Sequence, residues 1–212
     1  MNGNGNEPQE ELQLIRRAKR GDVKAFSRLY AGIYTELYKF ALYTIRHRQD
    51  AEDAVSETVM IAWEKMKQLR KDESFKSWMF TILNNQCRRI LREQRRRTGA
   101  DSQNGESPEM EKKLCSEPDY AGQHDVREAF GMLDEDERII VAFSIFGGYQ
   151  SDEIGRMTGY NPATVRSKKK RALEKINRAG GIARRVESVD DVKDIIAQAD
   201  REEREEGHHV VS

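Results

Sequence analysis

The chain contains few of the residues that interrupt helices or cross-link loops. It has four prolines and two cysteines in 212 residues, and neither glycine nor proline occurs between Ile33 and Thr98. So long a stretch without these residues predicts long helices. The two cysteines, Cys87 and Cys115, lie in different segments and lack metal-ligand spacing to the four histidines. This spacing argues against a disulfide or a zinc site.

Long apolar runs and a net charge are also absent. The longest nearly apolar run, at 139–146, is too short to span a bilayer, so no membrane insertion is expected. The polar start does not resemble a secretory signal, and we expect a cytoplasmic protein. The formal net charge is zero, but charge is sorted along the chain. Residues 88–97 hold six arginines and one glutamate, whereas 187–206 hold nine acids and three bases.

Composition divides the chain into two helical modules, a linker and a tail. Residues 98–124 include two of the four prolines and three glycines, which is typical of a flexible linker. This linker separates a module at 10–97 from a smaller one at 125–178. A tail at 182–206 has apolar residues at helical spacing and an acidic outer face. Its apolar positions are Val189, Val192, Ile195, Ile196 and Ala199. The sequence therefore predicts an all-α protein with two small domains.

In the first module, helical patterns cover 12–20, 23–33, 34–46, 50–69 and 75–97. Asp22 and Asp50 are predicted to cap the helices that follow them, because short carboxylate side chains accept hydrogen bonds from the first free backbone N–H groups. We expect one apolar stripe of each helix to face the core of the module.

The predicted helix at 50–69 has a second apolar face. Val59, Met60 and Trp63 lie to the side of its main stripe, near Glu52 and Ser56. An apolar face ringed by carboxylates is typical of a protein-binding surface, with the tryptophan as its anchor. Alternatively, Trp63 packs under a neighbouring helix and the acids stabilise the helix N-terminus. The residues alone leave both interpretations open.

The predicted helix at 75–97 combines an apolar face with a polar stripe. The apolar face is expected to comprise Phe75, Trp78, Met79, Ile82, Leu83, Gln86 and Ile90. The opposite stripe consists of Ser77, Thr81, Asn84, Asn85, Arg88, Arg92 and Arg95. Amides can bond to base edges, while arginines hold phosphates. Because few carboxylates balance these arginines, the stripe favours nucleic-acid binding over a merely solvated charged face.

The second module contains a helix, a glycine turn and a basic helix. The first helix is predicted at 149–157, the turn at 158–160, and a restart at Asn161 and Pro162. Arg166 and the basic cluster at 168–171 lie on the second helix. This order is typical of a helix-turn-helix, whose second helix enters the major groove of DNA.

Taken in order, these segments resemble the bacterial sigma factors of the extracytoplasmic-function (ECF) type, in the sigma-70 superfamily. DAEDAVSE at 50–57, followed by Trp63, resembles their helix that binds core RNA polymerase. FKSWM at 75–79 and the arginine-rich end resemble their downstream promoter-element helix. Their C-terminal domain, which reads the upstream element, is matched by Leu133, Asp134, Glu135, Arg138, Gly148, Glu153, Ile154, Gly159, Thr164, Val165, Ser167, Arg171 and Ala172.

The resemblance implies a promoter-specificity subunit that binds core RNA polymerase, recognises two promoter elements and helps to open the DNA. The implied polymerase contacts are Glu52, Asp53, Glu57 and Trp63. The implied DNA contacts are Asn84, Asn85, Arg88, Arg92, Arg95 and Arg96 in the first domain, and Thr164, Arg166, Ser167, Lys168, Lys170 and Arg171 in the second. An anti-sigma regulator is a further implied partner. Neither a cofactor nor a metal is implied.

The sequence departs from the family pattern in the second module. Gly155 and Thr158 stand where the family usually has alanine and leucine, and Lys169 occupies an apolar position, so we expect a weakened small core. The tail lies outside the resemblance. We expect it to fold back over this core and to lower the DNA affinity of the free protein. Alternatively, it is a solubilising extension or the docking site of a regulatory partner.

The rival hypothesis is a helix-turn-helix regulator that binds DNA as a dimer without polymerase. Its first module would then serve dimerisation, and it would protect a palindromic site by itself. An enzyme is not expected, because the sequence offers no nucleophile–base pair, metal cluster or phosphate-binding glycine loop.

Overall fold

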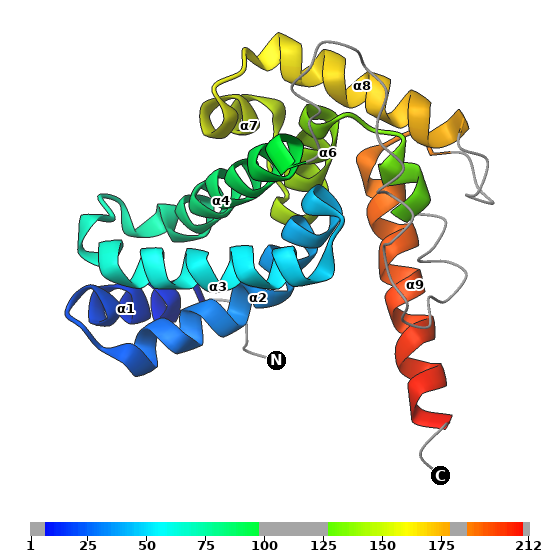
Figure 1. Cartoon of the computed structure of the whole chain (residues 1–212). Helices are drawn as coiled ribbons and strands as arrows, with labels where there is room; N and C mark the ends of the chain where they lie inside the picture. The colour runs from blue at the N-terminus through cyan, green and yellow to red at the C-terminus, as the bar shows by residue number, and fades with distance from the viewer. Residues whose placement is uncertain (1–6, 98–126, 179–185, 210–212) are drawn as a thin grey trace.

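The computed structural model describes residues 7–97, 127–178 and 186–209, and within these ranges all regular structure is helical (Figure 1). The first group comprises α1 (Glu7–Lys19), α2 (Val23–Ile45), α3 (Arg48–Lys65), the 3-10 turns η1 (Met66–Gln68) and η2 (Asp72–Ser74), and α4 (Phe75–Arg97). The second comprises α6 (Glu135–Ala142), the π-helical η4 (Phe143–Gly147), α7 (Ser151–Thr158) and α8 (Pro162–Arg178), and α9 (Val189–His209) follows. The predicted all-α class is confirmed. None of the helices in these ranges is long and apolar enough to cross a bilayer.

Helix α2 is continuous, so the predicted division into helices at 23–33 and 34–46 is wrong. No capping residue stands at that boundary, and buried apolar residues such as Leu29 and Leu37 continue across it. The predicted N-cap Asp22 is confirmed, because its Oδ1 accepts a hydrogen bond from the Ala25 backbone N–H at 3.1 Å. This cap fixes where α2 begins.

Helix α3 starts earlier than the sequence predicts. Its N-cap is His47, whose Nδ1 accepts a hydrogen bond from the Asp50 backbone N–H at 3.3 Å. Asp50 is therefore inside the helix, and its predicted role as the cap is wrong. The carboxylate instead accepts a hydrogen bond from Gln94 Nε2 at 2.6 Å, which ties the start of α3 to the end of α4.

Helix α4 is buried over a different surface from the predicted one. Its buried residues are Phe75, Met79, Phe80, Leu83, Asn84, Cys87 and Leu91. The predicted inward residues Ile82, Gln86 and Ile90 are only half-buried. The second helical group packs on the Phe80 side of α4, where Phe143 and Tyr149 lie 6.3 and 5.6 Å from the Phe80 ring. Burial also raises the pKa of the Cys87 thiol, which therefore stays protonated.

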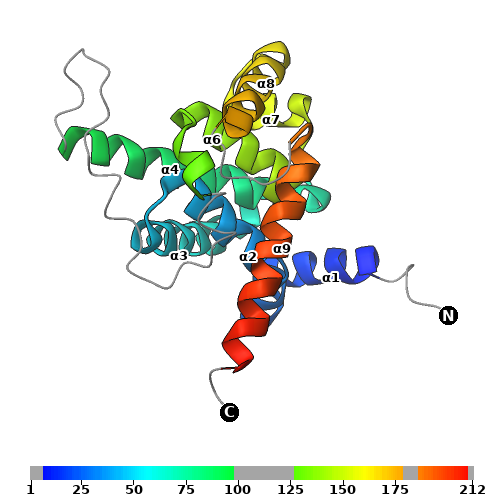
Figure 2. The same cartoon turned by 90° about the vertical axis from the view of Figure 1, so that its right-hand side faces the viewer.

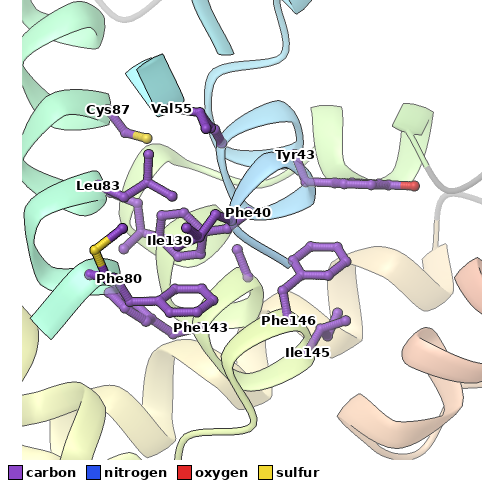
Figure 3. Packing of buried hydrophobic residues seen from close by; sticks show 14 of the residues in the cluster. Phe40, Tyr43, Val55, Phe80, Leu83, Cys87, Ile139, Phe143, Ile145 and Phe146 are labelled. Carbon is purple, nitrogen blue, oxygen red and sulfur yellow. The ribbon is translucent and has the colours of Figure 1, made fainter. Parts of the chain in front are cut away.

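The two helical groups pack against each other through aromatic side chains (Figure 3). The Phe40 and Phe143 ring centroids are 4.7 Å apart, and Tyr43 lies 5.2 Å from Phe146. Phe80 makes an edge-on contact with Tyr149 at 5.6 Å. Aromatic pairs at these separations add favourable quadrupole interactions to the burial of apolar area. The described residues therefore share one hydrophobic core that both groups build.

The turn between α7 and α8 follows the sequence prediction. Gly159 ends α7 in the left-handed conformation with φ of 82°, and Asn161 Oδ1 accepts a hydrogen bond from the Ala163 N–H at 2.8 Å. Gly155 has a different role from the expected one. A methyl group there would lie 2.7 Å from the Tyr160 carbonyl oxygen, so glycine permits this close approach. The expectation that Gly155 and Thr158 weaken this core stays a prediction.

Helix α9 folds back on the second helical group (Figure 2). It packs on η4 and buries Val192 and Ile196, while Val186 is buried just before it. The Asn177 side chain bonds to both backbone groups of Val186, at 2.5 and 2.7 Å, and so ties the end of α8 to the tail. The tail packs on η4, not over Gly155 and Thr158 as expected. The predicted linker, 98–124, and the first tail residues, 182–185, lie outside the described residues.

Candidate polymerase and nucleic-acid interface

The predicted polymerase-binding acids lie on the surface of α3. Glu52 Oε1 is 3.0 Å from the Nε of Arg48, within the same helix. Glu57 forms an ion pair with Arg89 of α4. Asp53 is exposed. Ion pairs this exposed contribute little to stability, so the carboxylates can exchange their partners for groups on another protein.

Trp63 shows features of both interpretations left open by the sequence. Its ring packs against Phe26 of α2, with centroids 5.2 Å apart. The indole is only half-buried, as is Val59, and Met60 beside them is 61% exposed. The second face of α3 therefore joins a partly open aromatic ring to an exposed thioether, bordered by acids. Such a surface suits an apolar partner with basic groups at its edge.

The predicted DNA-binding residues of α4 divide into exposed and covered ones. Asn85, Arg92 and Arg96 are exposed. Asn84 is 2% exposed, and its Oδ1 has no hydrogen-bond partner, so its amide does not reach solvent in this conformation. A helix turns every 3.6 residues, so adjacent asparagines point in different directions, and Asn84 lies on the buried side of α4 while Asn85 lies on the exposed side.

Two of the α4 arginines contact the start of α6. Arg88 Nη2 lies 3.6 Å from Asp136 Oδ1, and Arg95 Nη1 lies 3.2 Å from Glu135 Oε2. The Nε and Nη2 atoms of Arg88 are buried without a hydrogen bond. Both arginines are thus held by carboxylates of the second helical group.

On α8, the predicted DNA contacts form an open basic face with one exception. Arg166, Ser167, Lys170 and Arg171 are exposed, and Thr164 is half-buried. Arg166 Nη1 lies 3.5 Å from Asp152 Oδ1, a pair in which both side chains are largely exposed. Lys168 differs, because its Nζ lies 3.2 Å from Asp136 Oδ2 and its side chain is mostly buried.

Asp136 is the centre of this cluster, and the sequence did not single it out. Burial disfavours its charge, but hydrogen bonds from the Tyr160 hydroxyl and from Lys168 outweigh burial and hold the pKa of Asp136 below its usual value. The Tyr160 ring lies 5.9 Å from the Arg88 guanidinium carbon and 5.8 Å from Lys168 Nζ. Two cations from different helices therefore share one carboxylate and one aromatic ring.

Sequence analysis also missed a buried carboxylate that positions α8. Glu137 is 1% exposed and forms a capping box with Asp134 at the start of α6. Its Oε2 lies 2.7 Å from Lys175 Nζ on α8. A glutamate three residues after a capping aspartate is the capping-box signature, so the Asp134–Glu137 spacing could have identified Glu137 from the sequence. The bond to Lys175 fixes α8 against α6.

Comparison with known proteins matches these two helical groups separately. Residues 29–97 match Sigma-70 region 2, and residues 123–176 match Sigma-70, region 4. The chain is 26% identical over 182 residues to the RNA polymerase sigma-H factor of Pseudomonas aeruginosa, covering 81% of this chain and 94% of that one. It is 26% identical over 177 residues to the ECF RNA polymerase sigma factor SigM of Mycobacterium tuberculosis, covering 84% and 88%.

Among solved structures, the chain is similar to the sigma factor RpoE of Bartonella quintana, crystallised in complex with the anti-sigma factor NepR. That match has a TM-score of 0.61 and 25% identity, and it covers 76% of this chain and 100% of the other. The chain belongs to the ECF-type sigma factors of the sigma-70 family. It is a promoter-recognition subunit of RNA polymerase, whose partners are the core enzyme and promoter DNA.

Proposed function

We propose that α3 is the principal contact with core polymerase, through Glu52, Asp53, Glu57 and Trp63. The observation that supports this is the second face of α3, where a half-buried tryptophan and the exposed Met60 lie beside acids. Aromatic anchors of this kind dominate the free energy of protein interfaces. The acids would add charge complementarity and so favour a basic surface on the polymerase.

We propose further that the two helical groups act as separate DNA-binding domains, at 10–97 and 125–178. In the first, Asn84, Asn85 and residues 67–74 would hold unwound single-stranded DNA by pocketing or stacking its bases. The arginines Arg88, Arg92, Arg95 and Arg96 would hold the phosphates. In the second, α8 would read the duplex through Thr164, Arg166, Ser167, Lys168, Lys170 and Arg171, of which four are exposed.

The protein would act in the cytoplasm without catalytic chemistry of its own, because its contribution is recognition. An anti-sigma protein is a further proposed partner. The support is that the similar Bartonella sigma factor was crystallised with such a protein. Two sites on one promoter require some freedom between the domains, and residues 98–124 have the composition to provide it.

Replacing Trp63 and Glu57 together by alanine should weaken binding to core polymerase by about 2 kcal/mol or more, the usual cost of losing an aromatic hot spot. The affinity of the purified protein for core enzyme measures the effect. E64A removes an exposed acid from the same helix and should leave affinity unchanged. Circular dichroism must show a folded double variant, because Trp63 also packs on Phe26. Full affinity in a folded double variant would contradict the assignment of α3.

Arginines on the two DNA-binding helices should respond differently to substitution. R166A or R171A should cost about 1–3 kcal/mol of affinity for the upstream element if either residue makes a bidentate base contact. R88A and R92A should weaken binding to all sequences alike and reduce the salt slope by about one unit each. Titrating holoenzyme with promoter DNA over a range of salt concentrations separates the two effects. An unchanged salt slope in R88A/R92A would show that these arginines do not contact phosphates.

A further inference from the structure

The contacts between α4 and the second helical group use the same cations that the proposed function assigns to DNA. Arg88 and Arg95 of α4 face Asp136 and Glu135 at 3.6 and 3.2 Å. Lys168 of α8 faces Asp136 at 3.2 Å. A carboxylate offers anionic oxygens to these cations much as a phosphate does.

The apolar packing beside this cluster brings the two groups close enough for these ion pairs. Phe40 and Phe80 of the first group contact Phe143 and Tyr149 of the second, at centroid distances of 4.7 to 6.3 Å. In the same arrangement Asn84 is covered. A DNA strand therefore cannot reach Asn84, and it must compete with carboxylates for three of the cations.

We propose that Glu135 and Asp136 are an intramolecular substitute for DNA phosphates, which hold the free protein in a closed, autoinhibited conformation. This inference rests on the proposed function, because it needs Arg88, Arg95 and Lys168 to be DNA contacts.

The ion pairs of Arg88 and Arg95 with these carboxylates have the properties of contacts that DNA phosphates can replace. Arg88 reaches Asp136 only at 3.6 Å, and two of its nitrogens are buried without a hydrogen bond. Arg95 and Glu135 are partly exposed, so water screens their attraction. A DNA phosphate that displaces the carboxylate can accept hydrogen bonds from the Arg88 nitrogens that now lack a partner. Opening is then favoured when polymerase and DNA are both present.

The test uses the full-length double variant E135Q/D136N, which keeps the side-chain shapes and removes the two charges. Its affinity for a fluorescent duplex of unrelated sequence, without polymerase, should rise at least about fivefold, the lower end of typical coupling between sites. Its salt slope should steepen by about two to three units as Arg88, Arg95 and Lys168 become available. E11Q/E64Q changes net charge equally at exposed positions and is the matched control. A double variant indistinguishable from this control overturns the inference.

Two further variants separate this inference from the proposed function. R88Q/R95Q should weaken promoter binding by the holoenzyme, and in free protein it should remove most of the gain produced by E135Q/D136N. If R88Q/R95Q weakens the holoenzyme complex but E135Q/D136N behaves as the control, only the closed state is wrong. If R88Q/R95Q leaves the holoenzyme unaffected, the proposed DNA contacts fail and the inference fails with them.

Glu135 and Asp136 both lie in the first turn of α6, where acids stabilise the helix, so replacing both has a folding cost of its own. The single variant E135Q keeps the charge of Asp136, so it loses less of this stabilisation, and it frees Arg95 alone. It should steepen the salt slope by about one unit. A slope equal to that of E11Q would count against Glu135 as part of the closure.

Discussion

Replacing Phe143 by alanine should lower the free energy of unfolding by about 3–5 kcal/mol, the usual cost of removing a fully buried phenylalanine. The ring is fully buried and contacts Phe40, Phe80 and Tyr149 at 4.7, 6.3 and 6.1 Å. Because Phe40 and Phe80 belong to the first helical group, the cavity also weakens the contact between the two groups. Urea unfolding followed by circular dichroism measures the loss.

The control for Phe143 is Met132, which lies in the turn just before α6 and is 57% exposed. M132A should change the free energy of unfolding by less than about 0.5 kcal/mol, as surface substitutions usually do. If F143A unfolds at the same urea concentration as M132A, Phe143 is not packed between the two groups in solution.

Removing residues 182–212 should destabilise the second helical group and tighten DNA binding by the free protein. The stability effect follows from Val186, Val192 and Ile196, because burying one aliphatic side chain contributes about 1.5–3 kcal/mol. The affinity effect follows from charge, because residues 187–206 hold nine acids and three bases. Urea unfolding and fluorescence anisotropy with duplex DNA measure the two effects.

Two point variants test whether packing on η4 causes the stability effect. V192A shortens a fully buried side chain and should reproduce part of the loss, whereas K193A, at the neighbouring exposed position, should not. A truncated protein that matches the full-length one in both stability and DNA affinity would contradict the fold-back. The tail would then be a solubilising extension or a docking site for a partner.

Some local features of the fold were predictable because neighbouring residues in the chain determine them. Asp22 caps α2 through its own neighbours, and the turn before α8 needs only Gly159, Asn161 and Pro162. His47 was missed as the cap of α3 because an imidazole nitrogen is an uncommon acceptor at that position, and the carboxylate of Asp50 competed for the assignment.

Features that depend on packing between the two helical groups were not predictable from the pattern. The helical pattern of α4 identified its basic residues, but Phe80 packs against Phe143 and Tyr149 of the second group, which the pattern does not show. In the same way, Arg88 and Arg95 were recognisable as clustered cations. Their partners Glu135 and Asp136 lie far along the chain, beyond the linker, and looked only like the acidic first turn of a helix.

Run-off transcription with purified core polymerase tests the central claim most directly. With a template that carries its promoter, the full-length protein should produce a discrete transcript only when core enzyme is added, and R166A/R171A should reduce its yield. Without polymerase, the protein should bind the same DNA weakly and protect no palindromic site. Strong protection of a palindrome by the protein alone, without any core-dependent transcript, would contradict the sigma-factor account and favour a dimeric helix-turn-helix regulator.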